Sequence, residues 1–200
     1  MVRRNQSKKQ AEALARRLAA RKRQRNRRIL VSAAVGALLI GAIAFAVTRP
    51  GPAEVSGVQS FADQGRSHID PAAPTPSYDS DPATSGPHSA QSAACGIYRQ
   101  EIPTVVQLHD LEHGVVMLQY SPDIHPSERD ALETFGRDEG SHIIVAPRSG
   151  MDEPIVLTAW TKRLGLQTGD HAALKAFYDR YAGNGPERGV PCPNQVDEAA

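Results

Sequence analysis

Residues 114–160, GVVMLQYSPDIHPSERDALETFGRDEGSHIIVAPRSGMDEPIVLTAW, decide the fold of the globular part of this chain. The apolar run at 115–120 follows a glycine and has the length and β-branched content of a buried strand. Residues 126–139 begin with a proline that suits the first turn of a helix, and they place Leu132 and Phe135 at helical spacing. A strand followed by a helix is therefore predicted.

The second half of the same stretch predicts two more strands. Residues 143–146 and 155–160 are apolar runs separated by a turn-forming segment, so 143–160 is expected to form a hairpin with a long loop. Beyond it, Asp170 can cap a last helix that ends before Gly183. The order β-α-β-β-α predicts a small α+β fold, with an antiparallel-rich sheet and two helices packed on one face.

Upstream of this domain lies an uncharged run of twenty residues, 29–48, with the sequence ILVSAAVGALLIGAIAFAVT. A helix of that length spans roughly 30 Å, the thickness of the hydrocarbon layer of a bilayer. We therefore expect one transmembrane helix here. One alternative is a cleaved signal peptide, for which Ala44-Phe45-Ala46 reads as a cleavage site. A buried core helix is a second alternative, but core helices seldom lack a polar face.

Charge is divided unevenly on the two sides of this run. Residues 1–28 contain 12 lysines and arginines and one acid, whereas residues 49–200 contain 11 basic and 21 acidic residues. Positive charge beside a membrane segment stays in the cytoplasm. The sequence therefore predicts a cell-membrane protein with a cytoplasmic N-terminus and an extracytoplasmic C-terminal domain. Anionic lipid headgroups are the expected partner of residues 1–28. Specific binding of nucleic acid is not expected, because this segment lacks aromatic residues and groove-reading motifs, and no protein partner is indicated.

The expected organisation follows from these patterns. It comprises a basic cytoplasmic segment at 1–28, the transmembrane helix at 29–48, a flexible proline-rich linker and loop at 49–87, the α+β domain at 88–193 and a tail at 194–200. The two cysteines, Cys95 and Cys192, then lie outside the cytoplasm, where a disulfide between them would persist. The alternative is that both thiols bind a metal, but neither cysteine belongs to a CxxC motif.

Histidines provide the candidate functional site. His109 and His113 bracket the run HDLEH, and in a helical turn their i,i+4 spacing would place both rings on one face. His88, at the end of a loop, could supply a third ligand, and His68 or Glu112 a further one. Three imidazole nitrogens with an open position suit Zn²⁺ or Cu²⁺. The residue pattern favours neither of these two ions over the other.

Three functions agree with these residues. The first is a binding module that holds a transition metal or a small ligand through the clustered histidines. The second is an interaction or structural domain of the cell envelope, in which the histidines bond to backbone carbonyls. The third is a hydrolytic enzyme with a histidine base, although HDLEH places Glu112 beside the second histidine, unlike the HExxH motif of metalloproteases. The chain also lacks a G-x-S-x-G motif.

Five blocks of sequence follow one another along the chain: DPATSGPH, CGIY, LHDLEHGVVMLQY, IIVAPRSGMDEPIVLTAW and GPE. Together they resemble a bacterial family known as domain of unknown function 3105, over about residues 65–188. Ala83 departs from the family pattern, which has a second proline there. The resemblance implies a membrane-anchored or exported protein and supplies no activity. It marks as signature positions His88, Tyr98, His109, Glu112, His113, Tyr120 and Trp160.

Overall fold

The structure is a computed structural model that describes residues 23, 36, 55–70, 72–192 and 196–198. From Val55 onward the described residues form one compact unit. Almost all of the expected basic segment and transmembrane helix, residues 1–48, lies outside the described residues. Within the described part of the chain, no helix has both the length and the apolar character needed to cross a membrane.

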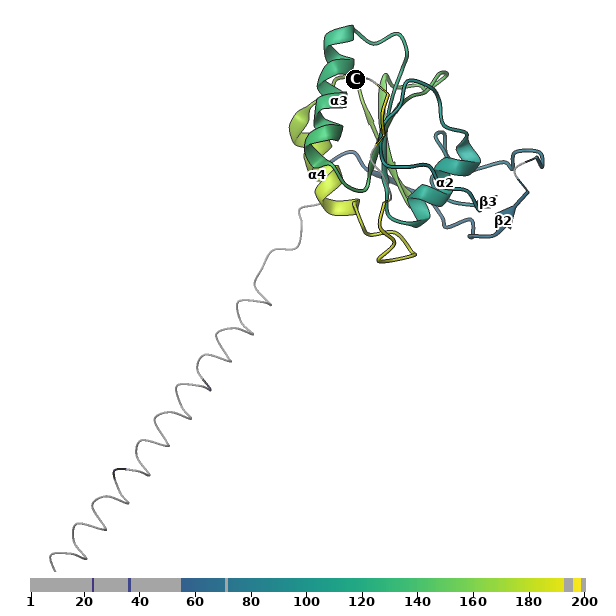
Figure 1. The fold of residues 1–200 in the computed structure, drawn as a ribbon, viewed down its shortest axis with the longest axis horizontal. Helices are drawn as coiled ribbons and strands as arrows, with labels where there is room; N and C mark the ends of the chain where they lie inside the picture. Colours follow the sequence, from purple (N-terminus) through teal and green to yellow (C-terminus); the bar gives the residue numbers. More distant parts are fainter. Residues whose placement is uncertain (1–22, 24–35, 37–54, 71, 193–195, 199–200) are drawn as a thin grey trace, which may run out of the picture. The chain divides into compact units, whose positions relative to one another are not determined.

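A seven-stranded sheet lies at the centre of this unit, in the order β1-β8-β7-β5-β6-β4-β9 (Figure 1). Its strands are β1 (Gln59–Ser60), β4 (Gly96–Ile97), β5 (Val116–Tyr120), β6 (Ile143–Pro147), β7 (Ile155–Ala159), β8 (Lys162–Leu166) and β9 (Val196–Asp197). A separate two-stranded sheet pairs β2 (His68–Ile69) with β3 (His88–Ser89). The helices in the described unit are α2 (Thr104–Glu112), α3 (Pro126–Glu139) and α4 (His171–Tyr181).

The α+β class is confirmed, but the central sheet is mixed rather than antiparallel-rich. β5 and β6 run parallel, because α3 fills the connection between them and returns the chain to the same end of the sheet. β7 then pairs antiparallel with the other edge of β5. The expected hairpin at 143–160 is therefore wrong, since β5 lies between its two strands. The hairpin that does form joins β7 to β8 through Trp160 and Thr161.

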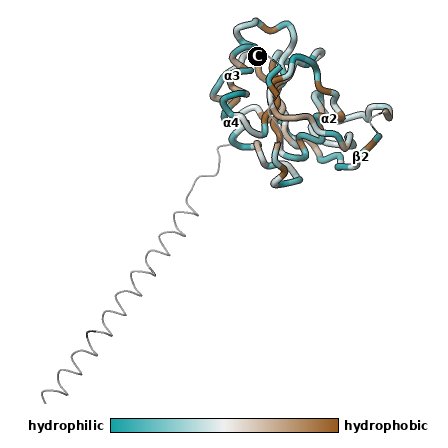
Figure 2. Tube along the Cα trace, in the orientation of Figure 1, coloured by the Kyte–Doolittle hydropathy of each residue, from teal (hydrophilic) through white to brown (hydrophobic). Residues whose placement is uncertain are grey.

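Helices cover both faces of this sheet, not the single face expected. On β5, Val116 and Leu118 pack in the core cluster that also contains residues of α3 and α4, whereas Met117 packs in a second cluster with Leu108 of α2. Figure 1 shows α3 and α4 on one side of the strands and α2 on the other. Strands buried on both faces lack polar alternation, and Figure 2 shows hydrophobic residues along the inner strands.

The described part of the expected linker, 55–70 and 72–87, belongs to the compact unit. Gln59 and Ser60 pair antiparallel with β8, and Ala83 is 2% exposed within the α2-side core. This segment also carries β2. The described part of the expected linker thus contributes both backbone pairing and buried side chains to the domain.

Cys95 and Cys192 form a disulfide, as the sequence indicated, with their Cα atoms 5.7 Å apart. The bridge joins the residue before β4 to the segment after α4, at a sequence separation of 97. Cys95 is 1% exposed and packs in the core cluster that contains Leu111 of α2. The disulfide therefore ties the C-terminal segment to the α2 side of the sheet.

Candidate metal centre

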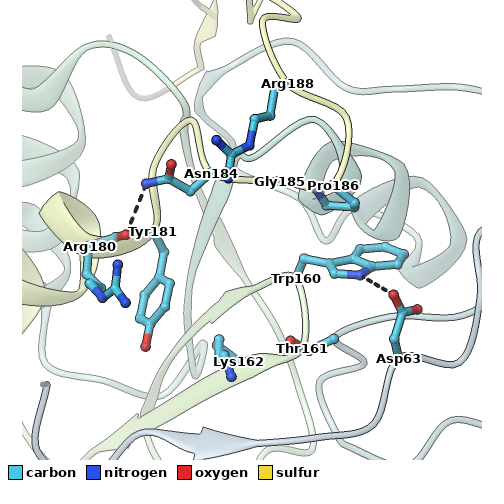
Figure 3. Close-up of a pocket in the computed structure, with 10 residues that line it drawn as sticks. All are labelled: Asp63, Trp160, Thr161, Lys162, Arg180, Tyr181, Asn184, Gly185, Pro186 and Arg188. Atoms are coloured by element: carbon cyan, nitrogen blue, oxygen red, sulfur yellow. Dashed lines mark hydrogen bonds between the residues drawn. The ribbon is translucent and has the colours of Figure 1, made fainter.

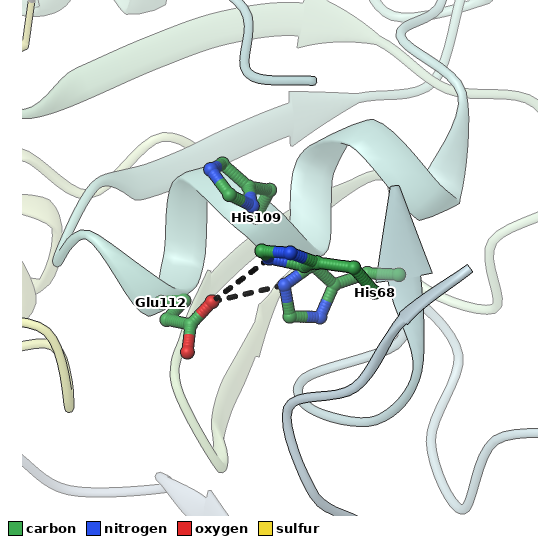
Figure 4. A group of neighbouring side chains, drawn as sticks. His68, His109 and Glu112 are labelled. Carbon is green, nitrogen blue, oxygen red and sulfur yellow. Dashed lines mark hydrogen bonds and ion pairs between the residues drawn. The ribbon is translucent and has the colours of Figure 1, made fainter. Parts of the chain in front are cut away.

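Four side chains that can bind a metal converge where α2 meets the small β2–β3 sheet (Figure 4). They are His68, His88, His109 and Glu112, and one ligand atom from each lies within 4.8 Å of all the others. Parallel pairing of β2 and β3 places His68 opposite His88. Helix α2 places His109 and Glu112 three residues apart, on one face of its last turn.

The end of α2 is fixed by local backbone hydrogen bonds. The N–H of Gly114 donates to the carbonyl of Leu111, and the N–H of Val115 donates to that of Asp110, at 3.0 and 2.9 Å. These two bonds form a Schellman motif, which needs a left-handed residue after the helix, and Gly114 supplies it with φ +85°. The helical turn expected for HDLEH is present. Its last turn is held in one orientation against the start of β5.

His88 is fully buried, and both of its ring nitrogens have partners. Nδ1 lies 2.8 Å from the carbonyl oxygen of Gly86, to which it donates because a carbonyl can only accept. Nε2 lies 2.9 Å from Oε2 of Glu112. With its proton on Nδ1, the neutral ring turns the Nε2 lone pair toward a carboxylate, and a proton or a cation must stabilise that contact. A backbone carbonyl fixing the far nitrogen is the usual arrangement for a metal-binding histidine.

His109 is the member of the cluster whose ring lacks a hydrogen-bond partner at a buried nitrogen. It is 8% exposed, and its Nδ1 is buried without a hydrogen-bond partner. Burial lowers the pKa of His109, and the neighbouring imidazoles of His113, His88 and His68 lower it further, against the opposing effect of Glu112. The ring is therefore neutral at pH 7, the form that binds metals. A buried nitrogen without a partner is costly, and coordination of an ion through Nδ1 would satisfy it.

Glu112 supplies the negative charge of the cluster. Its side chain is 8% exposed, Oε2 lies 4.0 Å from Nε2 of His68, and Oε1 lies 3.9 Å from Nε of Arg66. The nearby carboxyl of Asp110 is different, because burial raises its pKa to about 8 although the N–H of Ala93 donates to it. Asp110 is thus mainly neutral at pH 7. One carboxylate among three imidazoles would leave a divalent ion with a net charge of about +1.

The distances fit a transition metal with modest adjustment. With Zn–N and Zn–O bonds of about 2.0–2.1 Å, tetrahedral ligand atoms lie about 3.3 Å apart. The His88–Glu112 pair, at 2.9 Å, is already close to that spacing. His68 must approach Glu112 from 4.0 Å, and its half-exposed side chain has room to do so. The buried residues therefore form a preorganised part of the cluster, and His68 forms its adjustable side.

His113, which the sequence nominated as a metal ligand, lies outside the cluster formed by His68, His88, His109 and Glu112. It is the C-cap of α2, its ring centroid lies 4.3 Å from that of His109, and its Nε2 lies 3.4 Å from Oε2 of Glu187. It stays outside the group of converging ligand atoms. His68, which the sequence nominated only as a further ligand, lies inside it. The spacing of residues on α2 could not reveal this, because His68 is positioned by a two-residue strand pairing.

Comparison with known proteins places the domain in a family. A family model described as "Protein of unknown function (DUF3105)" matches residues 68–194. The matched range begins at His68, so it includes all members of the cluster as well as both cysteines. No curated protein and no solved structure matches the chain significantly. The site must therefore be interpreted from its own geometry.

Proposed function

Because the chain belongs to the DUF3105 family, whose description names no activity, we propose a function from the geometry of the cluster: the domain binds one divalent transition-metal ion through His68, His88, His109 and Glu112. The observation that carries this proposal is the convergence of four ligand atoms within 4.8 Å from three separate elements. The rings of His88 and His109 are also buried, and Nδ1 of His109 has no hydrogen-bond partner in the described structure.

The donor set favours Zn²⁺ or Cu²⁺ over Ca²⁺ or Mg²⁺. Imidazole nitrogens suit zinc, copper, iron and nickel, whereas calcium and magnesium select oxygen ligands. Three imidazoles and one carboxylate would complete a four-coordinate site. A closed site of this kind supports binding or storage of the ion rather than catalysis, which needs a position for water or substrate. The half-exposed side chain of His68 offers the route by which the ion enters.

Metal titration of the full chain tests the proposal. After removal of metal with a chelator, Zn²⁺ is expected to bind with a stoichiometry of one ion per chain in isothermal titration calorimetry. At an ion concentration 100 times Kd, the free energy of unfolding should rise by about 2.7 kcal/mol, seen as a higher melting temperature. Cu²⁺ should also quench the fluorescence of Trp160, the single tryptophan, whose ring centroid lies 6.1 Å from that of His88. Absence of binding by both ions would overturn the proposal.

We also propose that the domain is held outside the cytoplasm by an anchor at residues 29–48, with residues 1–28 against anionic lipid headgroups. The Cys95–Cys192 disulfide supports this location, because disulfides persist outside the reducing cytoplasm. Protease added to intact spheroplasts should then digest the domain while cytoplasmic proteins survive. A domain that is degraded only after lysis would contradict this orientation.

A further inference from the structure

A groove of about 530 Å³ lies beside the turn between β7 and β8, and its size is that of a small-molecule site. Figure 3 shows the side chains around the open space, with Arg180 and Tyr181 on one side and Trp160 and Asp63 on the other. Lys162 and Arg188 also line it. None of these residues belongs to the metal cluster, so the groove is a separate feature of the domain.

The basic residues of the groove differ from all the other described cations of this unit. Lys162, Arg180 and Arg188 form no ion pair with any carboxylate among the residues that the structure describes. Lys162 donates to the hydroxyl of Ser60 at 2.9 Å, and the Arg180 guanidinium lies 5.8 Å from the ring centroid of Tyr181. Each of the remaining described cations forms an ion pair with an acid: Arg66, Arg99, Arg129, Arg137, Arg148, Arg163 and Lys175.

This concentration of unpaired positive charge is unexpected in a domain rich in acids, since residues 49–200 contain 21 acidic and 11 basic residues. The one acid that lines the groove, Asp63, is already engaged. Its Oδ2 accepts from the indole N–H of Trp160 at 3.1 Å, and its Oδ1 accepts from the N–H of Gly65 at 2.9 Å. The groove therefore presents lysine and arginine donors without a matching carboxylate from the chain. Such donors bind phosphate and carboxylate oxygens through charge-assisted hydrogen bonds.

From these observations we propose that the groove binds a small ligand bearing a phosphate or carboxylate group. Lys162, Arg180 and Arg188 contact the oxyanion, and the half-buried Trp160 and Tyr181 form an aromatic wall for the rest of the ligand. Trp160 also lies against His88, at 6.1 Å between ring centroids, so the anion binds next to the metal centre. The anion site does not require the metal, because none of its cations contacts the cluster in the described structure.

Calorimetric titration of the metal-free full chain with inorganic phosphate and, separately, with succinate tests this inference and distinguishes the two oxyanions. At low ionic strength at least one probe should bind saturably, with one site per chain, and should change the emission of Trp160. Arg180→Gln and Arg188→Gln should each weaken binding by about five- to tenfold, because each removes one charge-assisted contact. Lys175→Gln removes a cation from the same helix as Arg180 but outside the groove, and should leave the affinity unchanged.

Two results would overturn the anion site. One is the absence of saturable heat and of a fluorescence change with both probes. The other is equal weakening by Lys175→Gln and by the groove variants, which would show attraction to general surface charge. Because the titration uses metal-free protein, failure of metal binding would leave the result intact, and failure of anion binding would not affect the metal stoichiometry.

Discussion

Replacement of His88 by alanine is expected to weaken Zn²⁺ or Cu²⁺ binding by at least about 100-fold. Loss of a residue that only orients a metal ligand typically costs 10–100-fold in metal affinity. This change removes a proposed ligand itself, whose tautomer and direction are fixed by the Gly86 carbonyl. It also leaves Glu112 without the partner 2.9 Å from its Oε2. Competition with a chromophoric chelator would measure the affinity of the purified full-length variant.

Matched histidine variants make this prediction specific. His171→Ala removes an exposed histidine at the start of α4, outside the cluster, and should leave metal affinity unchanged. His88→Gln keeps much of the side-chain volume, so it separates ligand loss from a packing defect if the alanine variant unfolds. If a folded His88 variant binds both ions as tightly as the unaltered chain, His88 is not a ligand.

Residue spacing predicted only part of this site, as His113 and His68 show. The i,i+4 spacing in HDLEH correctly predicted a helical turn, and the ring of His113 does lie near that of His109. The ligand atom that completes the cluster nevertheless comes from His68, because β2 and β3 pair in parallel and set this residue opposite His88. A two-residue strand has no periodicity from which such a pairing could be read. The same geometry implies a larger loss of metal affinity for His68→Ala than for His113→Ala.

For the fold as well, the sequence predicted where individual strands lie but did not predict how distant strands pair. The apolar runs at 115–120, 143–146 and 155–160 located β5, β6 and β7, because composition and length identify buried strands. Their order in the sheet depends on connections instead. The crossover through α3 makes β5 and β6 parallel neighbours, and β7 then finds its partner on the free edge of β5. A mixed sheet with helices on both faces follows from these pairings and not from any single segment.

Removal of the Cys95–Cys192 disulfide is the second change expected to have a large effect, and here the effect is on stability. The bridge closes a loop with a sequence separation of 97. In the chain-entropy description, a loop of that size restricts the unfolded chain by up to about 4.7 kcal/mol, and native disulfides commonly contribute 2–5 kcal/mol. The double variant Cys95→Ala/Cys192→Ala should therefore lose about 2–5 kcal/mol in free energy of unfolding. Urea denaturation followed by circular dichroism would measure it.

A reductant provides the internal control for this second prediction. Dithiothreitol should lower the unfolding midpoint of the unaltered chain toward that of the double variant, and should not affect the variant itself. A midpoint that is the same with and without the bridge would contradict the prediction.

Metal affinity should fall as well when the disulfide is lost, though by less than in the His88 variant. The disulfide anchors the segment after α4, and that segment packs against the last turn of α2. The N–H of Glu187 donates to the carbonyl of Glu112 at 3.0 Å, and a Cβ on Gly185 would lie 2.2 Å from the same oxygen. Without the disulfide, the segment after α4 is less ordered, and metal binding must also order its contact with Glu112. The cost of this ordering reduces the free energy of metal binding. We therefore expect the disulfide to stabilise both the fold and the orientation of Glu112, a residue of the proposed metal site, through the same segment.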